Sequence, residues 1–141
     1  MSPSTDGTPI HLRITARHMQ EDGSVQEIIT EAEGRLRGED GPGGMLQRVD
    51  YTDEEGNPSS LELTDHSLRA RGLFFEEGAR HPGTYPTPYG EIDLVAATER
   101  FAARLGAHGS MARVAYTLHE QGSDTAPPLT RVTMTISIRC T

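Results

Sequence analysis

The residues best suited to ligand chemistry lie in one short segment rich in hydroxyl groups and prolines, Tyr85-Pro86-Thr87-Pro88-Tyr89-Gly90. A residue before proline favours an extended backbone, so Tyr85, Thr87 and Tyr89 are predicted to project to roughly the same side. Their hydroxyls could hydrogen-bond a ligand. In the alternative interpretation the segment is structural: the two rings pack over one end of a β-structure, with Tyr89 at least half buried and Gly90 in a turn at positive φ.

Every basic residue of this chain is an arginine, 13 in all. Each guanidinium is a planar group suited to bidentate contacts with carboxylates or phosphates. By their spacing, Arg69 and Arg71 share one face, and so do Arg35 and Arg37. If such a pair faces inward it needs an acid or an anionic ligand, because an unpaired buried arginine is costly. If it faces outward, the acidic side chains available for pairing are Glu31, Glu33 and Glu62.

The histidines and the cysteine do not form a metal-binding pattern. His11 and His18 are an odd number of residues apart, so on one strand they face opposite sides. No His or Cys spacing fits a zinc site, and the single cysteine is Cys140. Neither a Gly-x-Ser-x-Gly elbow nor a phosphate-binding loop occurs. We therefore expect no metal, no cofactor and no enzymatic activity.

Length and charge restrict the class of protein. The 141 residues suffice for one domain, and the net charge of −8 makes nucleic acid a poor partner. No apolar stretch is long enough for a membrane helix, so no membrane contact is expected. Residues 1–9 lack the features of a secretory signal, and we expect a disordered lead before a domain over 10–139. A lone cysteine fits a reducing compartment, so a cytoplasmic protein is predicted. Cys140 itself, next to the last residue, is expected to be poorly ordered and dispensable.

Alternation of apolar and polar residues dominates the chain and predicts half-buried strands. The first strand places Ile10 and Leu12 on one face and His11 and Arg13 on the other, and the last strand, over 131–139, alternates in the same way. Turns are predicted at 53–58 and over the glycine-rich stretch 38–44. The other predicted strands cover 27–37, 45–52, 61–63, 68–75, 92–96 and 112–118. Eight to ten such strands are typical of an antiparallel sandwich or barrel.

Residues 95–105 fit two interpretations. Four alanines, the Phe101 and Leu105 pair and the following Gly106 favour a helix. A strand instead requires a β-bulge near Thr98 or Glu99, because the apolar positions change from even to odd numbers there.

Four pieces of the sequence carry a family resemblance: Phe75-Glu76-Glu77-Gly78, the segment from Thr84 to Gly90, Thr98, and Tyr116-Thr117-Leu118. With their spacing, they resemble the YwiB-like family of small bacterial proteins of unknown function over about residues 10–138. The resemblance implies a calycin-type, lipocalin-like up-and-down β-barrel, and therefore a strand over 95–105. The chain departs from the family at Arg71-Gly72, which lies closer to Phe75 than the usual Arg-Ser-Gly turn. The family brings no catalytic residues.

Two functions from different classes follow. In the first, a non-enzymatic, all-β barrel binds a small, partly apolar ligand in its interior or at its mouth. The candidate contacts for that ligand are Tyr85, Thr87, Tyr89, Arg69, Arg71 and Tyr116. In the second, the barrel is filled by its own side chains and serves as a structural or protein-interaction module. An interior cavity above about 300 Å³ would favour the first function, and a packed interior the second.

Overall fold

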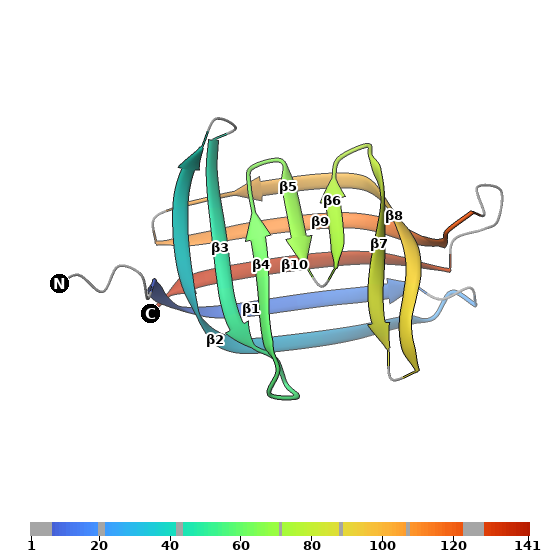
Figure 1. Ribbon diagram of the computed structural model, residues 1–141, viewed down its shortest axis with the longest axis horizontal. Helices are drawn as coiled ribbons and strands as arrows, with labels where there is room; N and C mark the ends of the chain where they lie inside the picture. Colours follow the sequence, from blue (N-terminus) through green and yellow to red (C-terminus); the bar gives the residue numbers. More distant parts are fainter. Residues whose placement is uncertain are drawn as a thin grey trace.

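The computed structural model of this chain is built from ten antiparallel strands and confirms the all-β prediction (Figure 1). It describes residues 7–19, 22–41, 44–70, 72–87, 89–106, 108–122 and 129–141, with their side chains except at 39–41, 44 and 85–87. None of the described elements is a helix long and apolar enough to cross a membrane. The strands are β1 (Thr8–Met19), β2 (Val25–Gly41), β3 (Gly44–Thr52), β4 (Pro58–Leu63), β5 (Ser67–Ala70), β6 (Leu73–Glu76), β7 (Arg80–Thr87), β8 (Gly90–Arg104), β9 (Gly109–Glu120) and β10 (Thr130–Cys140).

The strands form one up-and-down sheet that curls into a barrel, as predicted. Their order in the sheet is β6-β5-β4-β3-β2-β1-β10-β9-β8-β7. The first and last strands pair with each other, from Ile10 opposite Cys140 to Met19 opposite Arg131. The ends of the sheet, β6 and β7, meet at a seam. A Cβ atom on Gly83 would lie 2.6 Å from the Gly72 carbonyl oxygen, so the backbones touch there and no side chain fits.

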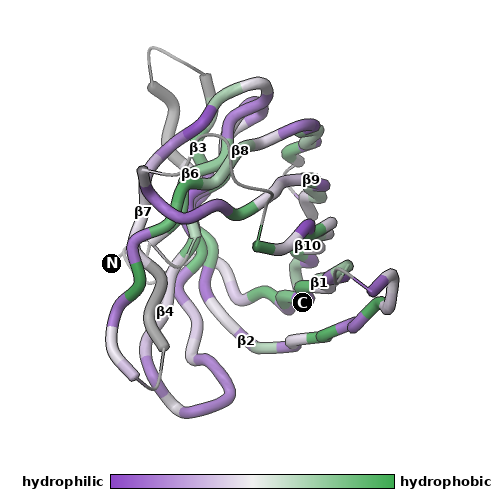
Figure 2. Tube along the Cα trace, turned by 90° about the vertical axis from the view of Figure 1, so that its right-hand side faces the viewer, coloured by the Kyte–Doolittle hydropathy of each residue, from purple (hydrophilic) through white to green (hydrophobic). Residues whose placement is uncertain are grey.

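Two long strands, β2 and β8, bend and take part in both layers of the barrel (Figures 1 and 2). In Figure 1, β1, β9 and β10 run across the view as one layer, and β3 to β7 cross in front of them as the other. The register of β8 shifts between Thr98 and Arg100. Such a bulge bends a strand around a barrel corner. In β2, a Cβ atom on Gly34 would lie 2.6 Å from the Asp50 carbonyl oxygen, so this close approach of β3 requires glycine.

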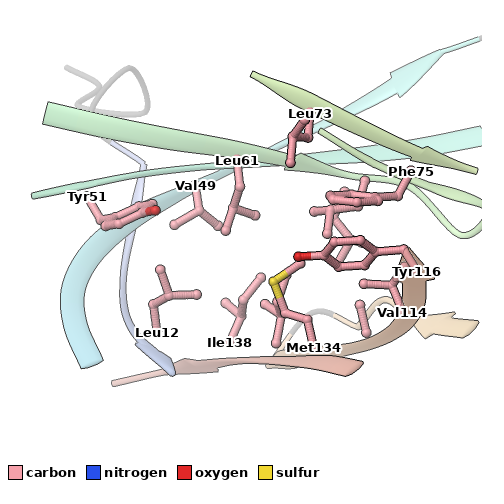
Figure 3. Packing of buried hydrophobic residues seen from close by; sticks show 14 of the residues in the cluster. Leu12, Val49, Tyr51, Leu61, Leu73, Phe75, Val114, Tyr116, Met134 and Ile138 are labelled. Atoms are coloured by element: carbon pink, nitrogen blue, oxygen red, sulfur yellow. The ribbon is translucent and has the colours of Figure 1, made fainter. Parts of the chain in front are cut away.

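Inward-facing side chains of the two layers point toward one another and form a buried apolar cluster (Figure 3). The Phe75 and Tyr116 rings pack against each other with centroids 4.4 Å apart. Around them, the buried apolar cluster contains Ile10, Leu12, Leu36, Val49, Tyr51, Leu61, Leu63, Leu68, Leu73, Ala96, Ala112, Val114, Val132, Met134, Ile136 and Ile138. Side chains of the chain itself therefore occupy the centre of the barrel.

A buried polar side chain joins opposite sides of the barrel. Gln47 of β3, at 3% exposed, is the least exposed of the buried polar residues that the structure describes. Its amide oxygen accepts a hydrogen bond from Ser110 Oγ at 2.5 Å, and its amide nitrogen donates to the Gly106 carbonyl oxygen at 3.3 Å. The Gly106 N–H donates in turn to Ser110 Oγ at 3.2 Å. The two bonds of Gln47 tie β3 to Gly106 and to the start of β9, and the third bond joins Gly106 to Ser110.

The strand interpretation of residues 95–105 is confirmed, and the bulge lies where the change of apolar positions predicts it. The prediction of a single strand over 68–75 is wrong. This stretch forms two strands, β5 and β6, joined by a turn in which Gly72 has a φ of 80°. Glycine adopts this left-handed conformation without strain from a Cβ atom, which allows the chain to reverse within a few residues.

Several element boundaries differ from the prediction, and three of the differences affect named expectations. The glycine-rich connection is shorter than 38–44, because β2 continues to Gly41 and β3 begins at Gly44. The first strand begins at Thr8, inside the predicted disordered lead, of which residues 1–6 lie outside the described residues. The expectation of a poorly ordered end at Cys140 is wrong, because this residue belongs to β10 and its N–H donates to the His108 carbonyl oxygen at 3.1 Å.

Candidate functional site

Exposed arginines gather on the outer face of the layer that contains β1, β9 and β10 and the adjoining parts of β2 and β8. Inward positions in these strands are apolar, so the residues between them point outward. The exposed arginines on this face are Arg13, Arg17, Arg100, Arg104, Arg113, Arg131 and Arg139, and its glutamates are Glu27, Glu31, Glu33 and Glu99. We call this surface, defined by these 11 residues, the arginine face.

The arginine face differs in charge from the rest of the molecule. Seven arginines and four glutamates give it a formal charge of +3. The remainder of the sequence, with six arginines and 17 acidic residues, carries −11, in keeping with the total of −8. An anion that approaches this chain is therefore attracted to one face of it and repelled elsewhere.

A cavity of about 310 Å³ lies within the arginine face. Its lining residues are His11, Arg13, Thr15, Glu31, Met111, Thr135, Ser137 and Arg139. Two guanidinium groups and three hydroxyl groups can therefore donate hydrogen bonds to an occupant. The Met111 side chain, which is 55% exposed, adds an apolar wall.

His11 is held between two carboxylates at the edge of this cavity. Its Nδ1 lies 3.0 Å from Glu33 Oε1, and its Nε2 lies 3.4 Å from Glu31 Oε1. The hydrogen bonds to Glu33 and then to Glu31 raise the pKa of His11 above its usual 6.5. A protonated His11 offsets the charge of both glutamates, so these carboxylates compete less strongly for the neighbouring arginines.

Arg13 and Arg139 are the cations best placed to hold an anion in this cavity. Arg13 Nε is 3.9 Å from Glu31 Oε1, a long and exposed ion pair of little strength. Arg139 forms no ion pair with the residues that the structure describes. Arg13 is directly opposite Ser137, and Arg139 is two residues further along β10, so the two guanidinium groups can reach one ligand group. Charge-assisted hydrogen bonds of this kind suit a carboxylate or a phosphate.

A second cavity, of about 630 Å³, lies between β2 and the β3–β4 hairpin and includes Arg35 and Arg37. Here the lining holds two arginines and two carboxylates, Glu33 and Asp50, so its formal charge is zero. Asp50 Oδ2 lies 3.5 Å from Arg37 Nη2, and Asp50 Oδ1 lies 3.2 Å from Arg48 Nε. Arg35 and Arg37 are thus on the outside of the barrel, and this cavity offers an anion less than the first one does.

Two of the residues predicted from the sequence to contact a ligand, Tyr116 and Arg69, lie on opposite sides of the sheet. Tyr116 is 7% exposed and packs in the core. Arg69 is exposed on the outer face of β5, with its guanidinium carbon 4.9 Å from the centre of the Phe74 ring. Tyr116 and Arg69 therefore cannot contact the same ligand. Arg71 lies outside the described residues.

The hydroxyl-rich segment forms the end of β7 and the turn into β8. Tyr85 is opposite Ile92 and Thr87 is opposite Gly90 in the register, and the side chains of both lie outside the described residues. The prediction that Tyr89 is at least half buried is wrong, because it is 99% exposed in the turn. The predicted positive φ of Gly90 is confirmed at 118°.

Arg113, and the nearness of Arg13 to Arg139, were not predicted from the sequence as parts of a site. The outward residues of the first and last strands were predicted correctly. In an up-and-down barrel these two strands pair with each other. That closure was the available signal, because it places His11 and Arg13 beside Ser137 and Arg139. Among the described residues, no group of three or more His, Cys, Asp or Glu side chains is arranged to hold a metal ion.

Comparisons with known proteins agree on the family and the fold. Residues 10–128 match the model of a domain of unknown function, DUF1934. A solved structure, the crystal structure of the ywiB protein from Bacillus subtilis, is similar with a TM-score of 0.53 and 19% sequence identity, covering 95% of this chain and 92% of that one. At this identity the likeness concerns the fold alone. No curated protein matches the sequence.

Proposed function

The chain belongs to the DUF1934 family, and we propose that it is a non-enzymatic binding protein that holds a small anionic ligand in the cavity of its arginine face. The observation that carries this proposal is the pair Arg13 and Arg139 beside Ser137. These two cations have weak or no acidic partners among the described residues and border a cavity of ligand size. The ligand that fits this site has a carboxylate or phosphate group and an apolar part that contacts Met111.

The ligand class is the one predicted from the sequence. The proposed binding site, however, lies on the outside of the barrel rather than in its interior or at its mouth. The inward side chains that the structure describes form one apolar cluster, most of it fully buried, and this supports binding on the outside. Binding at the barrel mouth by Tyr85, Thr87 and Tyr89 stays a prediction, and so does the calycin assignment. A cytoplasmic location is proposed on the same ground as before, the single Cys140.

We also propose that the protein is not an enzyme. One contact resembles a catalytic pair, but its environment argues against that role. Thr117 Oγ1 lies 2.8 Å from His119 Nε2, the spacing of a nucleophile and its base. Thr117, however, is 6% exposed, so a substrate has little access to its hydroxyl. Burial first, and then the nearby charge of Arg80, lower the pKa of His119, and no carboxylate contact orients its ring among the described residues. This pair is better explained as a hydrogen bond that satisfies a buried hydroxyl.

A titration followed by NMR tests the proposed site. Hexanoate supplies a carboxylate with a short apolar tail, and hexanol is its uncharged control. We expect hexanoate to shift amide signals of β1 and β10 and hexanol to leave them unchanged. Arg139→Gln and Arg13→Gln should each raise the Kd about tenfold or more, since one charge-assisted hydrogen bond is worth about 1.5–3 kcal/mol.

Arg37→Gln is the matched control, because Arg37 already has a partner in Asp50 outside this cavity. It should leave hexanoate binding unchanged. Equal weakening by all three variants, or equal binding of hexanol, would refute the site. Native mass spectrometry of the purified protein adds a second measurement: a co-purified molecule should be lost in Arg139→Gln.

A further inference from the structure

The arginines of β1, β9 and β10 are spaced regularly along the barrel. Successive outward positions across these three strands form rows, and each of five consecutive rows contains one arginine. In order along β10, these are Arg139, Arg13 opposite Ser137, Arg113 opposite Thr135, Arg17 opposite Thr133, and Arg131. We call these five residues the arginine ladder.

The row spacing follows from strand geometry. Outward residues on a strand are two apart, so neighbouring rows are separated by about 6.7 Å. From Arg131 to Arg139 the ladder extends about 27 Å, within a width of three strands, or about 10 Å. The hydroxyl groups of Thr133, Thr135 and Ser137 run down its middle strand. A ligand that lies along β10 therefore meets one cation per step, with a hydroxyl donor beside each of the three central ones.

The charges of the ladder are only loosely paired. The closest acidic contacts come from its borders: Arg17 Nε is 3.6 Å from Glu27 Oε2, Arg13 Nε is 3.9 Å from Glu31 Oε1, and Arg131 Nη2 is 3.7 Å from Glu99 Oε1. All of these groups are well exposed, so such pairs exchange readily for another anion. Arg113, like Arg139, forms no ion pair with a described residue.

We propose that the arginine ladder docks an extended acidic segment of another protein, with carboxylates at alternate residues. In an extended chain every second side chain projects to the same side, at the same spacing of about 6.7 Å as the rows of the ladder. Guanidinium groups bind carboxylates in a bidentate manner, which gives each row a preferred partner. This inference rests on the proposed function for two residues of the ladder, Arg139 and Arg13, and it adds Arg113, Arg17 and Arg131.

An acidic peptide fits this surface better than a nucleic acid does. Single-stranded nucleic acids are held by aromatic rings on which bases stack, and no outward position of β1, β9 or β10 holds Phe, Tyr or Trp. Outside the arginine face the sequence carries a net charge of −11, so a long phosphate backbone gains no further net attraction from the rest of the chain. A short acidic segment can lie on the ladder without extending beyond it.

Fluorescence anisotropy with two labelled decapeptides tests the proposal. One alternates Glu and Ser, and the other has five Glu followed by five Ser, so the two have the same charge and composition. We expect the alternating peptide to bind at least about tenfold more tightly, with an affinity that falls as salt is raised. A ten-nucleotide oligothymidylate should bind more weakly than the alternating peptide.

The matched variants use arginines of the same face. Arg17→Gln combined with Arg113→Gln should weaken binding of the alternating peptide at least tenfold. Arg100→Gln combined with Arg104→Gln removes the same charge from β8, outside the ladder, and should weaken it less than threefold. Equal effects of the two pairs, equal binding of the two peptides, or tighter binding of the oligothymidylate would each overturn the proposal.

Hexanoate separates this inference from the proposed function. Neither Arg17 nor Arg113 lines the cavity, so their double variant should still bind hexanoate like the wild type. If hexanoate binds normally and the alternating peptide shows no preference, the ladder is refuted and the cavity stands. If hexanoate does not bind and the alternating peptide does, the proposed small-ligand site is refuted instead.

Discussion

Replacing Gln47 by leucine tests whether the buried hydrogen bonds hold the barrel together. Gln47→Leu keeps the side chain nearly the same size, so the change removes hydrogen bonds without leaving a large cavity. Ser110 Oγ loses its acceptor and the Gly106 carbonyl loses its donor. Ser110 is also buried, so each orphaned group costs about 1–3 kcal/mol. The Gly106 N–H still donates to Ser110 Oγ, which offsets part of this loss. We therefore expect a loss of about 2–4 kcal/mol in the free energy of unfolding.

Urea denaturation monitored by circular dichroism measures this loss, with the double variant as the diagnostic arm. Gln47→Leu combined with Ser110→Ala should cost at least about 1 kcal/mol less than the sum of the two single variants, because both substitutions remove the same hydrogen bond between Gln47 and Ser110. Gln26→Leu, an exposed position on β2, is the matched control and should stay within about 0.5 kcal/mol of the wild type. A Gln47→Leu variant as stable as the Gln26→Leu control would refute the reasoning.

Three further predictions concern single residues. Gly90→Ala should cost about 1 kcal/mol or more in thermal or urea unfolding, because its φ of 118° strains any residue with a Cβ atom even though the space around it is open; an unchanged midpoint would contradict this. Cys140→Ser should cost about 0.5–1.5 kcal/mol, because Cys140 packs against the core, and a neutral effect would show that the end of β10 is not docked. The pKa of His11 is raised in the folded state by Glu33 and Glu31, so its stabilising contribution is complete below the unfolded value of 6.5 and is lost as pH rises through the higher folded value. Melting temperatures measured on either side of this window should fall with pH more in the wild type than in His11→Gln, and parallel curves would argue against the contribution.

The alternation of apolar residues that predicted the strands also indicates the turn between β5 and β6, which was not predicted. Leu68 and Ala70 are even-numbered and Leu73 and Phe75 are odd-numbered, and all four face the core. A change of this kind within a strand indicates a bulge, as at Thr98, or a reversal of the chain. Glycine at 72 distinguishes the two cases, because it can adopt the left-handed conformation that a tight turn needs.

The position of Tyr89 could not be predicted from its residue type. An aromatic ring next to prolines suggests burial through its apolar area. The ring direction, however, depends on the turn between β7 and β8, where Gly90 at positive φ starts the next strand and Tyr89 remains in solvent. Residue types around a turn do not fix which side of the barrel end the turn faces, because that is set by the register of both strands.

The candidate site depends on closure of the barrel rather than on any local motif. Arg13 and Arg17 come from the first strand, and Arg131 and Arg139 from the last, so these arginines are neighbours only when β1 pairs with β10. Their like charges repel one another, and the buried Ile10, Leu12, Ile136 and Ile138 on the opposite side of the same two strands supply the apolar contact that holds the pair together. The anion proposed to bind this surface would lower that repulsion and would require β1 and β10 to be paired, so its binding and this pairing would stabilise each other. The proposal therefore predicts that a bound ligand stabilises the fold at the β1–β10 pairing.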